Sequence, residues 1–437
     1  MYRIIFILLS LTTLSCNDKP KFNIFKEITI STDEQIYPPC RFQFNSDEEL
    51  FLSFPHFYDR NEEKDKNLPL MHFNSKENKL EKLQIEADLY SVMGFTINKD
   101  DHLYILNQGK IDKYNNIVDS PGLIIKKKES EETFNFTEND IKYSVLTDIV
   151  VDHEGKYAYI TDGGIMGNNK PGLIVLDLES KESYKVLKND KSFRKKVGKE
   201  GINSDNNDGP IPKIFDNIGV NNIQISCDDE TIYYSSIDSK ILYSVSIKDI
   251  FDAIKKYNSS NNDDDLNKIE VKEINLDFTS YHTLISSKNN IFGINKETKD
   301  VELSLTIDGD LSNYEKDKNQ KIEYEKPDTE YAPISINVNE GKLYVLITKI
   351  KEQGTRKLII YEAELNNDEF NNNVGCTIFI FKLYGSLIFI FVLVFIILCT
   401  AIMMIIANSG QKIEISNLKK EMEKEAEIDE LNRQLNE

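Results

Sequence analysis

The sequence lacks most of the features by which an enzyme or a nucleic-acid-binding protein is recognised. It contains no tryptophan, and its net charge of −20 comes with dispersed lysine and arginine residues, which disfavours a nucleic-acid partner. It has no Gly-rich phosphate loop, Gly-x-Ser-x-Gly elbow or His-Glu-x-x-His motif. Its five histidines are scattered at no metal-ligand spacing: His56, His72, His102, His153 and His282. The residue types therefore assign no catalytic residue.

Two long apolar runs lie near the ends of the chain. Residues 1–16 have a basic residue, an apolar run and small polar residues before Cys16, which is the pattern of a signal peptide and also fits loosely a bacterial lipoprotein site. Residues 383–407 carry no charge and are long enough for a transmembrane helix. Lysines follow this run and acidic residues precede it, so the positive-inside rule places the C-terminus in the cytoplasm.

These runs predict a type I single-pass membrane protein of the secretory pathway, at the plasma membrane or an endomembrane, with its large domain outside or lumenal. The expected parts are a signal peptide (1–16), the large domain (17–370), a juxtamembrane linker (371–382), the membrane span (383–407) and a charged cytoplasmic tail (408–437). The tail is helix-prone, and its short heptad pattern favours a solvated helix over a stable coiled coil.

Cysteine and asparagine residues of the large domain suggest modifications that suit this topology. Cys40 and Cys227 are candidates for a disulfide in an oxidising compartment, and two separate thiols are the alternative. Asn135 and Asn258 begin N-glycosylation sequons. The Asn- and Asp-rich tract at 258–265 is expected to be a floppy insertion between strands.

Between the two ends, one phrase recurs: an apolar strand, a charged turn and an aromatic strand. It is clearest at 147–187, where four short strand signals follow one another with Gly, Asn or Asp at the turns. Further copies lie at 41–57, 93–109, 221–238, 282–297 and 332–350. One such unit cannot bury both of its faces, so six copies predict an all-β, six-bladed β-propeller. Aspartates in the charged turns are expected to serve turn formation.

Polar residues gather where the inner strands of the expected blades meet the central channel. They are Asn107, Asp148, Asp162, Asn221, Asn222, Ser235 and Asn295. Carboxylates and amides converging from several blades could hold a metal such as Ca²⁺ or a cationic small molecule. The alternative is that they only hydrogen-bond strand ends and water.

The middle of the chain resembles the major royal jelly/yellow proteins. The resemblance rests on Asp148–Asp152, Ala158–Asp162, Gly172–Val175, Gly219–Ser226 and Leu242–Val245, and it extends over 36–365. It implies a six-bladed propeller of the secretory pathway, whose insect members act in pigmentation, nutrition or binding of biogenic amines. It implies no catalytic residue. The chain differs from that family pattern in its Asn221-Asn222 pair, its lack of tryptophan and its expected membrane anchor.

The function expected from the sequence is that of a membrane-anchored propeller that binds a small ligand, for example a cationic amine, or a protein partner at the channel mouth. One alternative is an enzyme, either of the dopachrome-converting type or a metal-dependent lactonase. The other is a structural or adhesive surface protein.

Overall fold

The computed structural model describes the propeller region with gaps and a few residues of the tail. The described residues are 23–31, 39–55, 69–74, 79–111, 117–136, 141, 144–164, 170–194, 219–226, 228–236, 241–275, 281–287, 290–295, 301–305, 320–322, 331–339, 342–349, 355–364, 419–420 and 423–424.

Within these residues, short antiparallel strands form six four-stranded sheets and one two-stranded sheet. Sheet 1 contains β2 (Arg41–Phe44), β3 (Leu50–Ser53), β4 (Leu70–Asn74) and β5 (Lys79–Lys82); sheet 2 contains β6 (Val92–Ile97), β7 (Leu103–Asn107), β10 (Gly122–Lys126) and β11 (Glu131–Asn135); sheet 3 contains β12 (Leu146–Val151), β13 (Tyr157–Asp162), β14 (Gly172–Asp177) and β15 (Ser183–Val186).

The second half of the chain continues the same arrangement. Sheet 4 contains β16 (Val220–Ile225), β17 (Thr231–Ser236), β18 (Ile241–Ser246) and β19 (Lys272–Asn275); sheet 5 contains β20 (Tyr281–Ser287), β21 (Asn290–Asn295), β22 (Val301–Leu305) and β23 (Gln320–Ile322); sheet 6 contains β24 (Tyr331–Asn339), β25 (Lys342–Lys349), β26 (Thr355–Glu364) and β1 (Asn23–Ser31). The small sheet pairs β8 (Lys110–Ile111) with β9 (Ile117–Asp119).

The sheets pack around an axis lined by their first strands. In chain order, each of β2, β6, β12, β16, β20 and β24 contacts the next, and β24 contacts β2. Apolar side chains fill the seams between neighbouring sheets, for example Tyr159 and Ile223 between sheets 3 and 4. This radial packing is that of a β-propeller, so the all-β propeller predicted from the repeats is confirmed.

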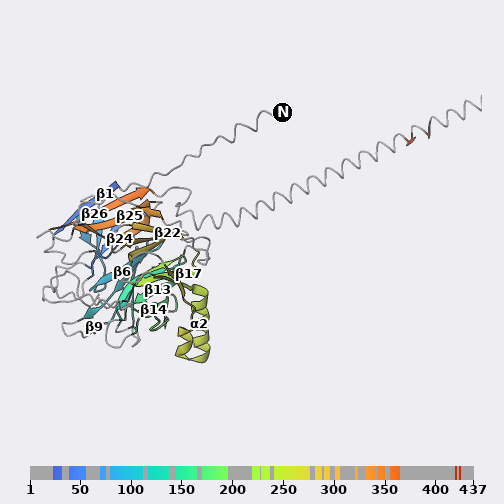
Figure 1. Cartoon of the computed structure of the whole chain (residues 1–437), viewed down its shortest axis with the longest axis horizontal. Helices are drawn as coiled ribbons and strands as arrows, with labels where there is room; N and C mark the ends of the chain where they lie inside the picture. The colour runs from blue at the N-terminus through green and yellow to red at the C-terminus, as the bar shows by residue number, and fades with distance from the viewer. Residues whose placement is uncertain are drawn as a thin grey trace, which may run out of the picture. The chain divides into compact units, whose positions relative to one another are not determined.

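The two ends of the propeller meet in sheet 6. Strand β1 pairs antiparallel with β26 from Asn23↔Glu362 to Ser31↔Thr355, and Figure 1 shows the blue first strand beside the orange last one. Because β1 comes from the N-terminus and β26 from the C-terminus, their ladder closes the ring of sheets. The sequence phrases did not predict this strand, because it lies outside any copy of the repeat.

In the part of the chain that the structure describes, the turns after β2, β6, β12 and β16 share one design. In each, the first residue accepts hydrogen bonds from later backbone N–H groups, as Asn45 does from Asp47 and Glu49, and Asn98 from Asp100 and His102. The fourth residue has a left-handed backbone, with φ between 55° and 70°, at Glu48, Asp101, Gly155 and Asp229. Among the turn aspartates, Asp228 accepts from the backbone N–H of Glu230, and Asp229 takes the left-handed position, so these two serve turn formation.

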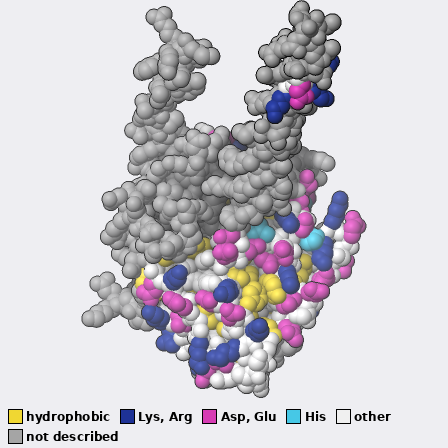
Figure 2. All heavy atoms as spheres, turned by 90° about the vertical axis from the view of Figure 1, so that its right-hand side faces the viewer, with side chains coloured by type: hydrophobic (Ala, Val, Ile, Leu, Met, Phe, Trp, Pro, Cys, Tyr) yellow, Lys and Arg dark blue, Asp and Glu magenta, His cyan; other side chains and the backbone are white. Residues whose placement is uncertain are grey.

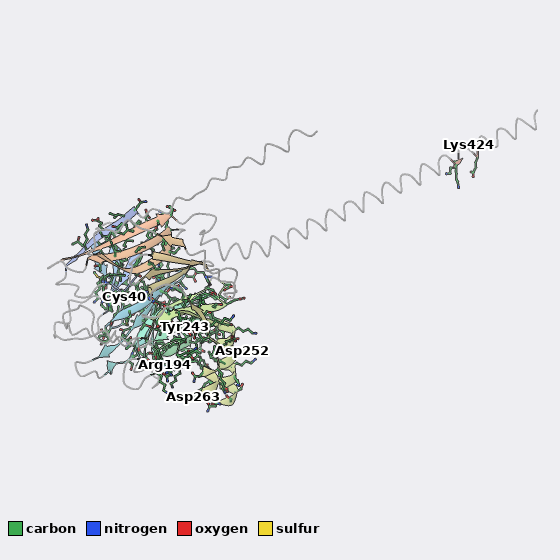
Figure 3. All side chains as sticks on the ribbon, in the orientation of Figure 1. Cys40, Arg194, Tyr243, Asp252, Asp263 and Lys424 are labelled. Atoms are coloured by element: carbon green, nitrogen blue, oxygen red, sulfur yellow. The ribbon has the colours of Figure 1, made fainter. Side chains whose placement is uncertain are left out.

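The insertion expected to be floppy is ordered. Residues Ile247–Ser260 form helix α2, and Asp263–Asn267 form the short 3-10 helix η2. Ile250 and Ile254 of α2 are buried against sheet 4. The hydrogen bond from Lys256, helped by Ser260, lowers the pKa of Asp265 to about 2. The polar tract suggested disorder, but α2 has an apolar stripe that is buried against the propeller, and a disordered segment has no such burial. Figure 3 labels Asp252 and Asp263 along this segment.

The chain divides between Asn373 and Val374 into two units. The expected signal peptide and the expected span at 383–407 lie outside the described residues, and among the described residues no helix is long and apolar enough to cross a membrane. In the tail, the described residues Lys419, Lys420, Glu423 and Lys424 are helical and exposed.

Ring closure by β1 can be tested with a neighbouring pair of substitutions. Ile28 is 4% exposed and packs with Phe42 and Leu358, whereas the next residue, Thr29, is exposed. Ile28→Ala is expected to lower the free energy of unfolding by about 2–4 kcal/mol, because it removes apolar burial and leaves a cavity. Thr29→Ala should change it by less than about 0.5 kcal/mol. Urea unfolding followed by far-UV circular dichroism measures both; equal effects would contradict closure through a packed β1.

Candidate functional site

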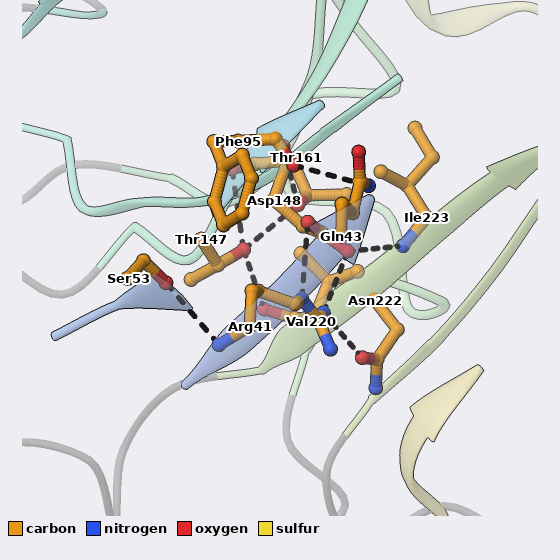
Figure 4. A network of polar contacts seen from close by, with 10 residues as sticks. All are labelled: Arg41, Gln43, Ser53, Phe95, Thr147, Asp148, Thr161, Val220, Asn222 and Ile223. Carbon is orange, nitrogen blue, oxygen red and sulfur yellow. Dashed lines mark hydrogen bonds and ion pairs between the residues drawn. The ribbon is translucent and has the colours of Figure 1, made fainter. Parts of the chain in front are cut away.

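A buried arginine crosses the axis of the propeller and joins three sheets. Arg41 of β2 donates from Nε to Oδ1 of Asp148 at 3.3 Å and from Nη2 to Oδ2 at 2.6 Å. The same Nη2 donates to Oδ1 of Asn222 at 2.6 Å (Figure 4). Strands β2 and β16 lie three places apart in the ring of innermost strands, so the contact between Arg41 and Asn222 runs between opposite sheets.

The carboxylate of Asp148 is also held from sheet 4. The backbone N–H of Ile223 donates to Oδ2 at 3.2 Å. Beside it, strand β6 comes so close that a Cβ added to Gly94 would lie 2.7 Å from Cα of Asp148. Only a glycine permits this approach. Arg41, Gly94, Asp148 and Asn222 therefore form one layer around the axis, which we call the central tier.

Local irregularities of the strands aim these side chains. The pairing of β12 with β13 shifts between Leu146 and Asp148, and that of β16 with β17 shifts between Val220 and Asn222. A bulge of this kind inserts one extra residue and re-aims the next side chain. Asp148 and Asn222 both follow directly after such a bulge. Ser335 follows the corresponding bulge in β24.

The tier holds two charges of opposite sign away from water. Arg41 is 8% exposed and Asp148 is 4% exposed. Burial raises the pKa of Asp148 above its usual value, and Arg41 and the Ile223 N–H oppose part of this rise. Burial alone would lower the pKa of Arg41, but Asp148 and Cys40 together outweigh it, so the net shift is upward. The site is thus a matched ion pair with no net charge.

Hydroxyl groups extend the network along the seam between sheets 3 and 4. Thr147 Oγ1 lies 2.8 Å from Thr161 Oγ1 and donates to the backbone oxygen of Val220 at 3.1 Å. Ser235 of β17 pairs with Asn222 as Thr161 pairs with Asp148. Among the buried side chains that the structure describes, the hydroxyls of Ser235 and Ser335 have no hydrogen-bond partner.

The residues predicted for the channel mouth do share one end of the propeller. We call this end, where the innermost strands begin, the loop face, and the opposite end, where the turns after those strands lie, the turn face. Of the predicted residues, Asp148 and Asn222 are brought together by Arg41. Asn221 and Asn295 lie in strands β16 and β21, but their side chains are outside the described residues.

The side chains of Asp162 and Asn107 make their hydrogen bonds to residues outside the central tier. Asp162 is fully buried, and its Oδ2 lies 2.5 Å from Nζ of Lys185 and accepts a hydrogen bond from Ser144. Burial raises the pKa of Asp162, and Lys185 opposes the rise. Asn107 accepts from the N–H of Tyr90 and donates to the backbone oxygen of Asp88, so it fastens the connection before β6.

Sequence reasoning missed Arg41, the residue that organises the tier. The signal was present, because Arg41, Gly94, Asp148 and Asn222 occupy the first or second position of four copies of the repeated phrase. The prediction instead included Asn107 and Asp162, which end the second strands of sheets 2 and 3.

The other predicted features are placed as follows. Cys40 is a free, half-buried thiol whose pKa is raised by burial, and Cys227 lies outside the described residues. Asn135 is exposed on the outer strand β11, and Asn258 is exposed on α2, where its Nδ2 donates to the hydroxyl of Tyr184 at 3.1 Å. No group of three or more His, Cys, Asp or Glu residues suited to a metal occurs among the described residues.

The tier predicts a strong energetic coupling between Arg41 and Asp148. Arg41→Met leaves a buried carboxylate without its partner, so it should lower the free energy of unfolding by about 3–5 kcal/mol. Arg41→Met combined with Asp148→Leu should cost clearly less than the sum of the single changes, with a coupling of about 1–3 kcal/mol. Urea unfolding of the full chain in detergent, followed by circular dichroism, gives the free energies of unfolding of the unmodified chain, of Arg41→Met, of Asp148→Leu and of the double variant.

An exposed ion pair of the same length serves as the control. Lys191 Nζ lies 2.6 Å from Glu273, with the lysine side chain 78% exposed. Lys191→Met should cost less than about 1 kcal/mol, because solvent screens this pair. Additive effects of the two tier substitutions would show that Arg41 and Asp148 do not act as a pair.

Comparison with solved structures gives weak similarities to several proteins. An aldose sugar dehydrogenase from Streptomyces coelicolor, in its PQQ-bound form, matches with a TM-score of 0.43 and 9% identity over 79% of this chain and 99% of that one. The Cps50 (Swd1) β-propeller domain from Myceliophteria thermophila gives a TM-score of 0.41 and 9% identity over 78% and 99%. Hydrazine synthase of Kuenenia stuttgartiensis gives 0.41 and 9% over 62% and 72%.

The comparison with curated proteins gives no match. The comparison with protein families matches residues 90–372 to the major royal jelly protein family. This stretch covers well over half of the chain and includes β6 through β26, with Asp148 and Asn222 of the central tier. The chain belongs to the major royal jelly protein family.

Proposed function

We propose that this chain is a membrane-tethered, six-bladed β-propeller that binds a small molecule or a protein partner at its loop face. The observation that carries the proposal is the central tier. Because Asp148 is paired with Arg41, and Asp162 with Lys185, the buried carboxylates near the axis are committed to the scaffold. The groups that meet a ligand are then those of the surrounding connections.

Six blades are supported by the six four-stranded sheets and by the cyclic contacts of their innermost strands. The pairing of β1 with β26 supports closure of the ring between the last blade and the first. The tether is supported by the uncharged run at 383–407, which follows the last strand of the propeller, and by the signal-peptide pattern at 1–16.

The loop face is the better candidate for recognition because it carries most of the long connections. Several of them join one sheet to the next or the second strand of a sheet to the third, at 54–69, 108–121, 136–145 and 187–219. Long surface connections on a rigid scaffold are where binding residues concentrate. On the other face, the described turns after β2, β6, β12 and β16 are short, and their polar groups hydrogen-bond within the turns.

A cationic amine remains the small ligand that the family suggests. At the loop face it would have to replace Arg41 as the partner of Asp148, or use a carboxylate of the connections such as exposed Asp88. Nucleic acid is a poor partner for this chain, because positive side chains are interspersed with negative ones over the described part of the side of the molecule shown in Figure 2.

Charge reversals on the two faces test the proposal. The full chain in detergent is melted with increasing dopamine, histamine or serotonin, since a ligand that binds the native state raises its melting temperature. Asp88→Lys, at an exposed loop-face position, is expected to lower the apparent affinity for the amine at least about tenfold, because it replaces a negative charge with a positive one that repels the ligand. Lys170→Glu, at another exposed loop-face position, removes a positive charge and should not lower the affinity.

Glu154→Lys and Lys99→Glu, at exposed turn-face positions, are the matched controls and should leave the shift unchanged. A shift that is lost in the turn-face variants and kept in Asp88→Lys would contradict the assignment. If none of the amines shifts the melting curve, the small-amine form of the proposal is wrong, and a protein partner is the remaining form.

A further inference from the structure

Two pairs of neighbouring sheets are joined at the turn face by the same contact. In sheet 1, the second turn residue, Ser46, donates its backbone N–H to Oδ1 of Asp101 at 2.8 Å and its hydroxyl to Oδ2 of the same side chain. Asp101 is the fourth turn residue of sheet 2. One carboxylate thus accepts both a backbone and a side-chain donor from the preceding turn, and we call this contact a clasp.

The second clasp has the same positions but a different donor. His153, the second turn residue of sheet 3, donates its backbone N–H to Oδ2 of Asp229 at 3.0 Å, and its Nδ1 lies 2.6 Å from Oδ1. Asp229 is the fourth turn residue of sheet 4. Between sheets 2 and 3 the fourth position is Gly155, which has no carboxylate to offer. Of the clasps formed by described residues, the one between sheets 3 and 4 contains a group that titrates near neutral pH.

The surroundings of His153 are mainly acidic. Asp229 faces it from the turn of sheet 4, and Asp152 and Glu154 flank it in its own turn. Lys99, from the turn of sheet 2, is the positive group that opposes them. The imidazole is 47% exposed, so protons reach it freely. A positive charge on His153 is therefore favoured while the clasp is closed.

The seam that this clasp joins is the one that carries the tier. Toward the loop face, Thr147 bonds to Val220, and Asp148 bonds to the backbone of Ile223. These contacts hold β12 against β16 through buried groups. At the turn face, the clasp of His153 with Asp229 joins the same two innermost hairpins. The two ends of the seam thus differ in kind: the contacts of the tier are buried, and the clasp is open to solvent.

We propose that the turn-face end of the seam between sheets 3 and 4 is a proton-sensitive latch, closed when His153 is protonated and loosened when it is neutral. Strand pairs β12–β13 and β16–β17 would then separate more readily at the turn face in a neutral or alkaline medium than in a mildly acidic one. This behaviour is independent of any ligand, so its test does not depend on the proposed binding function.

The direction of the pH dependence follows from the pKa of His153. The hydrogen bond to Asp229 raises the pKa above its usual value, and burial opposes the rise in part. A group whose pKa is higher in the folded state stabilises that state fully below the unfolded pKa, about 6.5, and loses this contribution as pH rises through the folded value. If the pKa of His153 in the folded state lies one pH unit above its pKa in the unfolded state, protonation changes the ratio of closed to open clasp by about tenfold.

Hydrogen exchange of the full chain in detergent tests the latch. Peptides that cover 147–160 and 225–235 are followed from pH 6 to pH 9, with rates corrected for the intrinsic pH dependence of exchange. Protection of these turns should fall by about threefold to tenfold over this range. The turns around Ser46 and Asp101, whose clasp does not include a histidine, provide the internal reference and should keep their protection.

Two variants separate the latch from a general loosening. His153→Ser copies the donor of the first clasp, so protection in the sheet 3 and sheet 4 turns should become independent of pH. Asp229→Asn keeps a residue that tolerates the left-handed backbone but removes the charge, so the NMR titration of His153 should shift to lower pH. A fall in protection that persists in His153→Ser, or no fall in the unmodified chain, would overturn the proposal.

Discussion

The structure depends on one buried ion pair that spans the axis of the propeller. Arg41 reaches from sheet 1 to Asp148 of sheet 3 and to Asn222 of the opposite sheet 4. Removing two charges from water is costly, and only close geometry with further hydrogen bonds offsets that cost. Here the Ile223 N–H and the Asn222 amide supply those bonds. Sheets 1, 3 and 4 are thereby linked to one another across the axis.

The fold could be predicted from the sequence to the extent that it repeats. The phrase of apolar strand, charged turn and aromatic strand located the innermost hairpins of the sheets that the structure describes, because alternation and turn residues are local signals. Strand β1 was missed because its partner, β26, lies more than 300 residues away, and no local pattern encodes that pairing. Helix α2 was missed because a polar tract at its end concealed the stripe formed by Ile247, Ile250 and Ile254.

The candidate site was less predictable, because its chemistry depends on which side chains meet. The sequence pointed to Asp148 and Asn222 as members of one cluster, and they are. It left open whether their oxygens face a ligand or the protein. That question was decided by Arg41, which comes from more than 100 residues away and is one basic residue among the 53 lysines and arginines of the chain. The tier and the clasp show the same rule: equivalent positions of a repeat acquire different roles through the residue placed there.

The central claim is that the tier is scaffold and that binding takes place on the connections around it. An experimental structure of the full chain, determined in detergent with a saturating amine from the panel, tests this claim most directly. We predict that Arg41 stays between Asp148 and Asn222, and that any bound molecule lies against the loop-face connections. A ligand or metal in contact with Asp148, with Arg41 turned away from it, would contradict the account and make the axis itself the functional site.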